Sequence, residues 1–302
     1  MLLSQILEKE NFIVDEQYII KNEKEFDSLG LLVSDIDLKL CAFLDDERFL
    51  DSITDRITML ITTPELEKKV SKKDVGICVV TSPRFLFFKI HNYLSGNKEY
   101  IRKRFETKIG DNCDISEHAI IADHNVVIGN NVKIEEFVVI RENTVIGDNT
   151  VIRAGVKIGG VGFEFKRMQQ GIEPVQHLGG VKIGKNVEIQ YNTCIDKAVY
   201  PWDNTVVGNY SKIDNLVHVG HAVKISDNVL IVAQSGIGGR TVIESDCWVG
   251  FSTTISNGLH MGKSARANIG SVVTKNVMQE ESVTGNFAIS HEKFIKNLKN
   301  MV

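Results

Sequence analysis

The feature that most constrains the fold of this chain is an aliphatic residue that recurs every six positions after residue 108. The first block consists of Ile128, Ile134, Ile140, Ile146, Ile152 and Ile158. The same spacing recurs in two later blocks, within residues 183–195 and 207–261. A period of six matches neither an α-helix, at about 3.6 residues per turn, nor a plain strand, at about two. It is typical of a short strand and a corner, repeated along a solenoid. We therefore expect a mainly β fold, a parallel β-helix of hexapeptide repeats.

Three hexapeptides close one triangular coil of about 18 residues, so residues that far apart should lie on neighbouring coils. Two stretches interrupt the repeat and should form loops. Residues 159–182 contain glycines, aromatic residues and a proline, and the stretch 196–205, DKAVYPWDNT, places Pro201 at an inward position. A long excursion from a repeat usually carries function.

The chain is expected to have three parts. Residues 1–107 mix helical and strand patterns and predict a small α/β domain. Residues 108–285 carry the repeats and predict the β-helix domain. Residues 286–302 end in SHEKFIKNLKNMV, which predicts a short basic C-terminal helix.

Composition argues against several classes of protein. The net charge of −4, with Lys and Arg spread along the chain, gives no basic patch for nucleic acid. No apolar run approaches the roughly 18 residues that span a bilayer, and the first residues lack the apolar stretch of a signal peptide. We therefore predict a cytoplasmic protein. The five cysteines form no CxxC pair, and histidines and acids show no ligand spacing, so no metal site is expected.

Two histidines lie in IDNLVHVGHAVKI, residues 213–225. Because the valines on either side of His218 point inward, His218 should point outward, while His221 should lie at a corner beside Gly220. Either is consistent with a solvated surface histidine. A corner imidazole next to a glycine also suits a general base. Gly239 follows His221 by one coil, and a backbone N–H there could stabilise a developing oxyanion. Such a pair on adjacent coils suits acyl transfer from a thioester.

Other polar and aromatic residues are weaker candidates for substrate binding. Asp196 and Asp214 stack on each other if the intervening loop preserves the phase of the coil, and one of them could then orient a histidine. Both, like Asn215, could instead satisfy N–H groups at corners. Phe163 and Gln176 lie in the first interruption and are candidates for lining a sugar or pantetheine channel, with ordinary loop packing as the alternative.

Four stretches resemble one family of enzymes: GFEFKRMQQGIEPVQHLGGVKIGKNVEI, TCIDKA, SKIDNLVHVGHAVKI and VTGNFAISHEKF. They are similar to the UDP-3-O-acylglucosamine N-acyltransferases of lipid A biosynthesis. AFLDDERFLDSI and TSPRFLFFKI resemble the uridine-binding domain of that family. The resemblance implies a left-handed β-helix and a homotrimer with active sites between subunits. It also implies transfer of a 3-hydroxyacyl group from acyl carrier protein to the amine of a UDP-glucosamine derivative, with no permanently bound cofactor.

Individual residues match the pattern of this family. His221 matches the catalytic base, Gly239 matches the backbone oxyanion donor, and His218 becomes a neighbouring substrate contact. Phe43 and Phe49 match aromatic positions that flank uracil. The family has an asparagine where this chain has Asp46, and an ionised carboxylate can only accept hydrogen bonds.

The sequence also departs from the family pattern. Gly258 falls on a second family histidine, with His260 two residues later, and the family's helical extension is nearly absent after Phe294. These departures favour one alternative, and a second stays open beside it. One is an N-acetyltransferase that uses acetyl-coenzyme A or a short acyl-coenzyme A on a nucleotide-linked amino sugar of a surface polysaccharide. The other is a non-catalytic hexapeptide scaffold that binds a nucleotide sugar.

Overall fold

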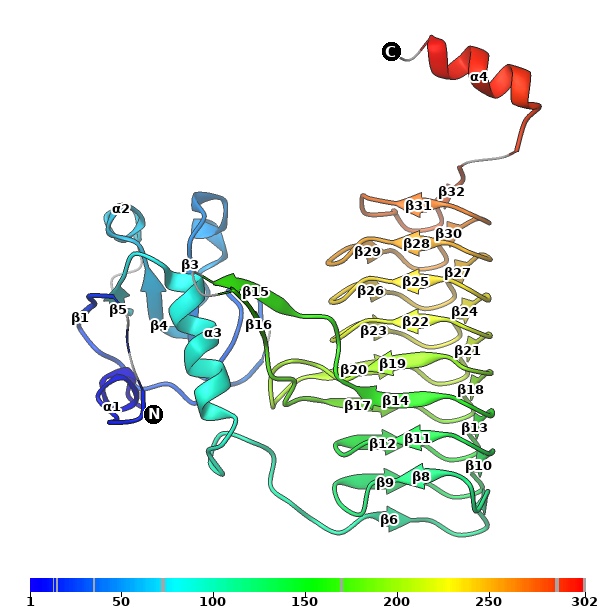
Figure 1. The fold of residues 1–302 in the computed structure, drawn as a ribbon, viewed down its shortest axis with the longest axis horizontal. Coiled ribbons are helices and arrows are strands. Elements are labelled where there is room, and N and C mark those ends of the chain that lie inside the picture. Colours follow the sequence, from blue (N-terminus) through cyan, green and yellow to red (C-terminus); the bar gives the residue numbers. More distant parts are fainter. Residues whose placement is uncertain are drawn as a thin grey trace. The chain divides into compact units, whose positions relative to one another are not determined.

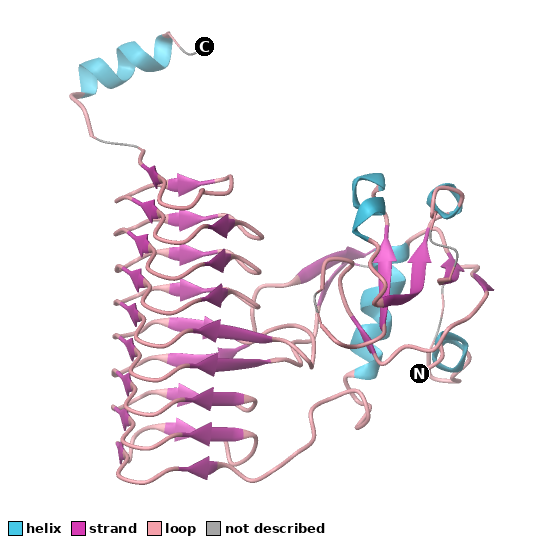
Figure 2. Cartoon of the chain, turned by 180° about the vertical axis from the view of Figure 1, so that it is seen from behind, coloured by secondary structure: helices cyan, strands magenta, loops and turns pink. Residues whose placement is uncertain are grey.

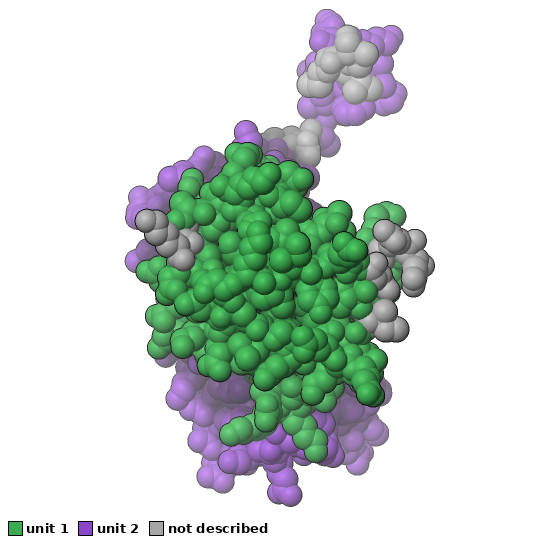
Figure 3. Space-filling view, turned by 90° about the vertical axis from the view of Figure 1, so that its left-hand side faces the viewer, with its two compact units in different colours: residues 1–103, 163–178, 199–202 green, residues 104–162, 179–198, 203–302 purple. Residues whose placement is uncertain are grey.

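The computed structural model describes residues 1–12, 14, 16–34, 36–71, 74–168, 171–285 and 288–300. These described residues fall into two compact units, coloured separately in Figure 3. The first unit comprises Met1–Lys103, Phe163–Leu178 and Val199–Trp202, and the second comprises Arg104–Gly162, Gly179–Ala198 and Asp203–Val302. Parts of both interruptions of the repeat therefore belong to the first unit. The sequence predicted that this unit would consist of residues 1–107 alone.

The first unit is a small α/β fold around a mostly parallel sheet (Figure 1). Within the described residues its strand order is β1-β5-β4-β3-β2, with β1 antiparallel to β5. The strands are β1 (Ile19–Lys21), β2 (Ser28–Leu29), β3 (Leu40–Leu44), β4 (Ile57–Thr62) and β5 (Gly76–Val79). The helices are α1 (Leu3–Leu7), the 3₁₀ helix η1 (Glu47–Ser52), α2 (Pro64–Glu67) and α3 (Pro83–Leu94).

Helix α3 joins this sheet to the first interruption of the repeat. Pro83 begins the helix, where its missing N–H costs nothing. The buried His91 contacts the Gln176 carbonyl oxygen through Nε2 at 2.8 Å and the Tyr100 hydroxyl through Nδ1 at 3.0 Å. Burial lowers the pKa of His91 to about 4, so this imidazole is neutral at physiological pH. The interruption itself forms an antiparallel hairpin of β15 (Phe165–Met168) and β16 (Gly171–Pro174).

The second unit is a parallel β-helix, with strands stacked coil upon coil on three faces (Figure 2). We call the face that carries His218 the histidine face; its described strands are β8 (Ile120–Ile121), β11 (Val139–Ile140), β14 (Lys157–Gly160), β19 (Cys194–Asp196), β22 (His218–Val219), β25 (Gly236–Ile237), β28 (Thr254–Ile255) and β31 (Val272–Val273). The next face along the chain has β6 (Lys108–Ile109), β9 (Val126–Ile128), β12 (Thr144–Ile146), β17 (Gly180–Ile183), β20 (Asn204–Val207), β23 (Lys224–Ile225), β26 (Val242–Ile243) and β29 (His260–Met261). The third has β7 (Asp114–Ile115), β10 (Lys133–Ile134), β13 (Val151–Ile152), β18 (Glu188–Ile189), β21 (Lys212–Ile213), β24 (Leu230–Ile231), β27 (Trp248–Val249), β30 (Arg266–Ala267) and β32 (Ser282–Val283).

The coil follows the period-six pattern. Ile134 pairs with Ile152 and Ile140 pairs with Ile158, so residues one coil apart in sequence do stack. The inward isoleucines and valines form one continuous buried core. Many corners carry a residue in the left-handed region, such as Asn131 at a φ of 56°. Asparagine tolerates this conformation better than most residues, which explains the NN and DN pairs between strands.

Two further elements complete the description. Helix α4 (His291–Lys299) lies within the segment where the sequence predicts a C-terminal helix. Across the described ranges, each helix falls short of the length and apolarity that a membrane span requires.

Candidate active site

The centre of the candidate site is His221, at the corner between β22 and β23. Its side chain is buried, with 9% of the residue exposed. A β-carbon placed on Gly239 would lie 2.6 Å from His221 Cε1 and 2.7 Å from His221 Nε2. The Arg240 N–H also donates to the His221 carbonyl oxygen at 2.8 Å. The predicted stacking of Gly239 on His221 is therefore confirmed, and the backbone of Gly239 lies directly against the imidazole.

The backbone around Gly239 is fixed by the hydrogen-bond ladder of the coil. The Gly238 N–H donates to the Ile255 carbonyl oxygen at 2.9 Å, and the Arg240 N–H is held by His221. The Gly239 amide lies between these two anchored amides and beside the imidazole. An imidazole and a rigid N–H at one corner are groups that can accept a proton and stabilise a negative oxygen.

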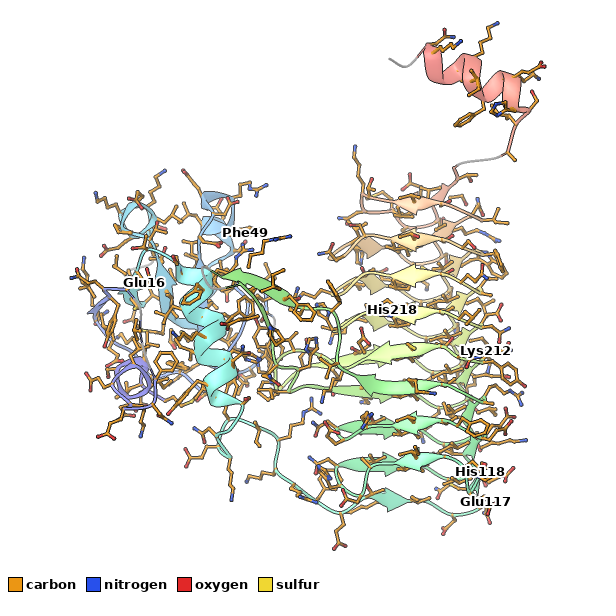
Figure 4. The ribbon with its side chains drawn as sticks, viewed as in Figure 1. Glu16, Phe49, Glu117, His118, Lys212 and His218 are labelled. Carbon is orange, nitrogen blue, oxygen red and sulfur yellow. The ribbon has the colours of Figure 1, made fainter. Side chains whose placement is uncertain are left out.

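Asp196 lies close to His218 on the histidine face. Strand β19 pairs with β22 and places Cys194 opposite His218. The buried Asp196 carboxylate approaches His218, with 3.7 Å between Asp196 Oδ2 and His218 Nε2. Burial raises the pKa of Asp196, while the imidazoles of His218 and His221 act in the opposite direction. His218 itself is exposed on β22, where Figure 4 labels it.

Asp196 and Asp214 do not stack, because the second interruption does not preserve the phase of the coil. The second interruption lengthens its coil by six residues, so that Asp196 lies on the histidine face and Asp214 follows β21 on the third face. The Asp214 carboxylate accepts the Asn215 N–H at 2.7 Å and the Ala233 N–H at 3.1 Å. Asn215 Oδ1 accepts the Tyr191 N–H at 3.0 Å. Asp214 and Asn215 therefore cap corners, as the alternative expectation held.

Asp196→Asn and Asp214→Asn are expected to have opposite effects on the stability of the fold at pH 8. Because burial disfavours the charged form of Asp196, its raised pKa contributes stability at low pH that is lost as pH rises through that pKa. At pH 8 Asp196→Asn should keep or raise the unfolding temperature. If Asp196 orients a catalytic histidine, kcat/KM should fall about 10- to 100-fold, by analogy with the outer carboxylates that orient metal-binding histidines.

Asp214→Asn replaces one of two accepting oxygens with a donor and should cost about 1–3 kcal/mol of stability. Thermal unfolding at pH 5 and pH 8, together with steady-state kinetics, measures both effects. A destabilised Asp196→Asn protein with unchanged kcat/KM would contradict the expectation that Asp196 orients a histidine.

Two predicted nucleotide-binding aromatic residues lie in the first unit. Phe43, on β3, is half-buried against Phe87, with 4.9 Å between ring centroids. The Arg84 guanidinium lies 5.3 Å from the centroid of the Phe43 ring. Phe49 projects from η1 with 44% of its surface exposed (Figure 4). An exposed aromatic ring is available for stacking on a base.

Asp46 caps the start of η1 and is engaged by Arg48. Its carboxylate accepts the Arg48 backbone N–H at 3.0 Å and the Arg48 guanidinium at 2.6 Å. These hydrogen bonds lower the pKa of Asp46 to about 2, so the group is ionised at neutral pH. Asp46 therefore presents a guanidinium-paired carboxylate at the position of the family asparagine.

The first unit also contains a pocket of about 940 Å³ that the sequence did not predict. Arg84 forms an ion pair with Asp45 at 2.7 Å on its wall. Its charged lining mixes acids and bases, contributed by Glu16, Asp45, Arg84, Lys89, Lys166, Arg167 and Glu173. The basic residues of TSPRFLFFKI and of the first interruption could have indicated a charged pocket. They are far apart in the sequence, however, and only the folded chain brings them together.

Two of the remaining candidates belong to the first unit and one to the β-helix. Phe163 belongs to the first unit, 89% exposed, and packs on Phe165 with 4.8 Å between ring centroids. Gln176 belongs to the same unit, where its N–H donates to Asn92 Oδ1 at 3.0 Å. His260, on β29, directs Nε2 at Glu244 Oε1 at 3.0 Å.

Comparison with known proteins places these features in context. Residues 125–160 match the model of the bacterial transferase hexapeptide family, which describes six repeats. A UDP-3-O-acylglucosamine N-acyltransferase of Delftia acidovorans is 32% identical over 145 residues, which cover 48% of this chain and 43% of that protein. UDP-3-O-acylglucosamine N-acyltransferase 2 of Legionella pneumophila is 49% identical over 90 residues, covering 30% of this chain and 26% of that protein. The matched segments thus span less than half the length of these curated relatives.

Solved structures support the fold. A UDP-N-acetylglucosamine acyltransferase from Arabidopsis aligns with a TM-score of 0.54 at 22% identity, over 64% of this chain and 67% of that one. The corresponding protein from Campylobacter jejuni aligns with a TM-score of 0.54 at 19% identity, over 65% of this chain and 79% of that one. The similarity in sequence to the UDP-3-O-acylglucosamine N-acyltransferases is therefore confirmed. The second unit is a left-handed parallel β-helix of hexapeptide repeats.

Proposed function

We propose that this protein is an N-acyltransferase that moves an acyl group from a thioester to the amine of a UDP-glucosamine derivative. The observation that carries this proposal is the burial of His221 against the backbone of Gly239, on adjacent coils of a hexapeptide β-helix. The names of the curated relatives support the reaction and the class of sugar. The proposed donor is a 3-hydroxyacyl group on the phosphopantetheine of acyl carrier protein.

In the proposed reaction, the sugar amine attacks the thioester carbonyl carbon as its proton passes to His221. The carbonyl oxygen becomes negative, and the Gly239 N–H stabilises it. Collapse of this intermediate breaks the carbon–sulfur bond, and the leaving thiolate takes the proton from His221. The products are an amide and a free pantetheine thiol, and Asp196 stabilises the transient imidazolium.

The first unit is proposed to hold the uridine nucleotide. Phe49 offers an exposed ring, and Phe43 lies beneath the Arg84 guanidinium. The engagement of Asp46 by Arg48 means that uracil would not meet a donating amide there. A homotrimer and a cytoplasmic location are parts of the same proposal.

A side-by-side donor assay tests this function. UDP-glucosamine, with and without a 3-O-acyl group, is incubated with 3-hydroxyacyl carrier protein, with acyl-coenzyme A or with acetyl-coenzyme A. We expect thiol release that depends on the amine, fastest with the hydroxyacyl carrier protein, and a product heavier by one acyl group. Preference for acetyl-coenzyme A would favour the acetyltransferase alternative. Uridine nucleotide binding without transfer from any donor would favour the scaffold alternative.

A further inference from the structure

The hydroxyl of Thr205 joins the base of the second interruption to the corner that carries His221. Thr205 is the last residue of the stretch 196–205 and lies buried on β20. Its Oγ1 donates to the carbonyl oxygen of Asp196, the first residue of that stretch, at 2.6 Å. The same oxygen accepts the N–H of Ala222, the residue after His221, at 2.8 Å. One side chain therefore links the backbone at Asp196 to the backbone beside His221.

Ala222 occupies a corner position that the backbone alone holds elsewhere in the coil. Its φ of 59° lies in the left-handed region, as does the φ of 61° at Arg240, whose N–H donates to the His221 carbonyl oxygen on the preceding coil at 2.8 Å. Comparable bonds to a carbonyl oxygen on the preceding coil are donated at other corners by the N–H groups of Leu216, Asn228, Gln234, Asp246 and Ser252. Before Ala222 the chain leaves the repeat in the stretch 196–205, and the Thr205 hydroxyl accepts the N–H instead.

Loss of this hydroxyl would act directly on the corner of His221. A left-handed alanine is strained and persists only where its surroundings hold it. Ala222 is buried, so its N–H would lose its acceptor in a place that water does not readily reach. The backbone of Ala222 would then relax, and the imidazole of the preceding residue would lose its fixed position against Gly239.

We infer that Thr205 is a positioning residue for acyl transfer, whose hydroxyl fixes the corner of His221 and so the placement of the imidazole against the Gly239 backbone. This inference rests on the proposed function, because the placement matters to the reaction only if His221 takes the proton from the amine. Thr205 acts through His221 and does not itself touch the reacting atoms. Its removal should therefore lower kcat and leave substrate binding in place.

The test compares Thr205→Val and Thr205→Ala, which lack the hydroxyl, with Thr205→Ser, which keeps it. Thr150→Val is the matched control, because the buried Thr150 hydroxyl also bridges two backbone groups, donating to the Gly184 carbonyl oxygen at 3.0 Å and accepting the Val187 N–H at 3.3 Å. We expect kcat to fall at least about tenfold in Thr205→Val and Thr205→Ala, with the KM of both substrates within about threefold of wild type. Thr205→Ser should restore kcat, and Thr150→Val should lower the unfolding temperature without lowering kcat.

A double variant shows whether Thr205 acts through His221. In the His221→Ala background there is no imidazole left to position, so adding Thr205→Val should lower the residual rate by no more than about threefold. A residue with a separate structural effect on the reaction would instead lower kcat by the same factor in both backgrounds.

Four results would overturn the inference while leaving the proposed function in place. A folded Thr205→Val or Thr205→Ala protein with wild-type kcat is the first, and a Thr205→Ser protein as slow as these two is the second. Equal losses from Thr205→Val with and without His221 are the third. The fourth is that neither variant without the hydroxyl folds, because Thr205 would then hold the coil as a whole. Failure of the wild-type protein to transfer any acyl group would instead count against the proposed function.

Discussion

Replacing His221 by alanine is expected to lower kcat/KM by about 10²- to 10⁴-fold, the usual contribution of a positioned general base. The physical reason is that the attacking amine must lose a proton as the new carbon–nitrogen bond forms. His221 is buried at a corner against Gly239, so water cannot readily replace the imidazole there. Steady-state kinetics with the preferred donor measures the loss.

His218→Ala is the matched control for His221→Ala. His218 lies on the same coil and near the same carboxylate, but it is exposed and carries no glycine backbone against its ring. We expect a loss of kcat/KM several-fold in size, mainly through KM. Uridine nucleotide binding, followed by calorimetry, should stay the same in both variants. Equal losses for the two histidines, or near-normal activity of His221→Ala, would contradict the assignment of His221 as the base.

Gly239→Ala is expected to lower kcat/KM by about 10- to 10³-fold, up to the loss seen when an oxyanion donor is removed. The new methyl group would lie within 3 Å of three ring atoms of His221, so the imidazole must move away from the backbone. The imidazole then no longer has the position relative to the Gly239 N–H that the attacking amine and the thioester carbonyl together require. The loss should appear in kcat more than in KM, because both groups act in the transition state.

Gly285→Ala provides the control for Gly239→Ala, since a β-carbon on Gly285 would meet nothing within 4 Å. It should leave kcat/KM unchanged. Thermal unfolding shows whether Gly239→Ala is folded under the assay conditions. A folded Gly239→Ala enzyme with wild-type kcat would exclude the arrangement of base and oxyanion donor described above.

The sequence predicted the coil well because a solenoid repeats one local pattern. An isoleucine at every sixth position shows which side chains point inward. Because residues one coil apart stack, this pattern was enough to place Gly239 over His221. The same rule failed for Asp196 and Asp214, where an interruption lengthens the coil. Counting from the repeat cannot show how a loop returns to the helix.

The sequence was less informative where packing between distant segments decides the structure. Residues 163–178 and 199–202 join the first unit, through contacts such as His91 with Gln176 and Trp202 with Leu29. No periodic pattern marks these partners.

The most direct measurement is the identity of the atom that becomes acylated. The wild-type protein is incubated with a carbonyl-labelled 3-hydroxyacyl thioester and a UDP-glucosamine derivative, and the product is examined by mass spectrometry and carbon NMR. A new amide at the sugar nitrogen, formed by the wild-type protein and lost in His221→Ala, is the expected result. An ester, hydrolysis of the thioester without a sugar product, or an amide formed equally by His221→Ala would contradict base-assisted N-acyl transfer at this corner.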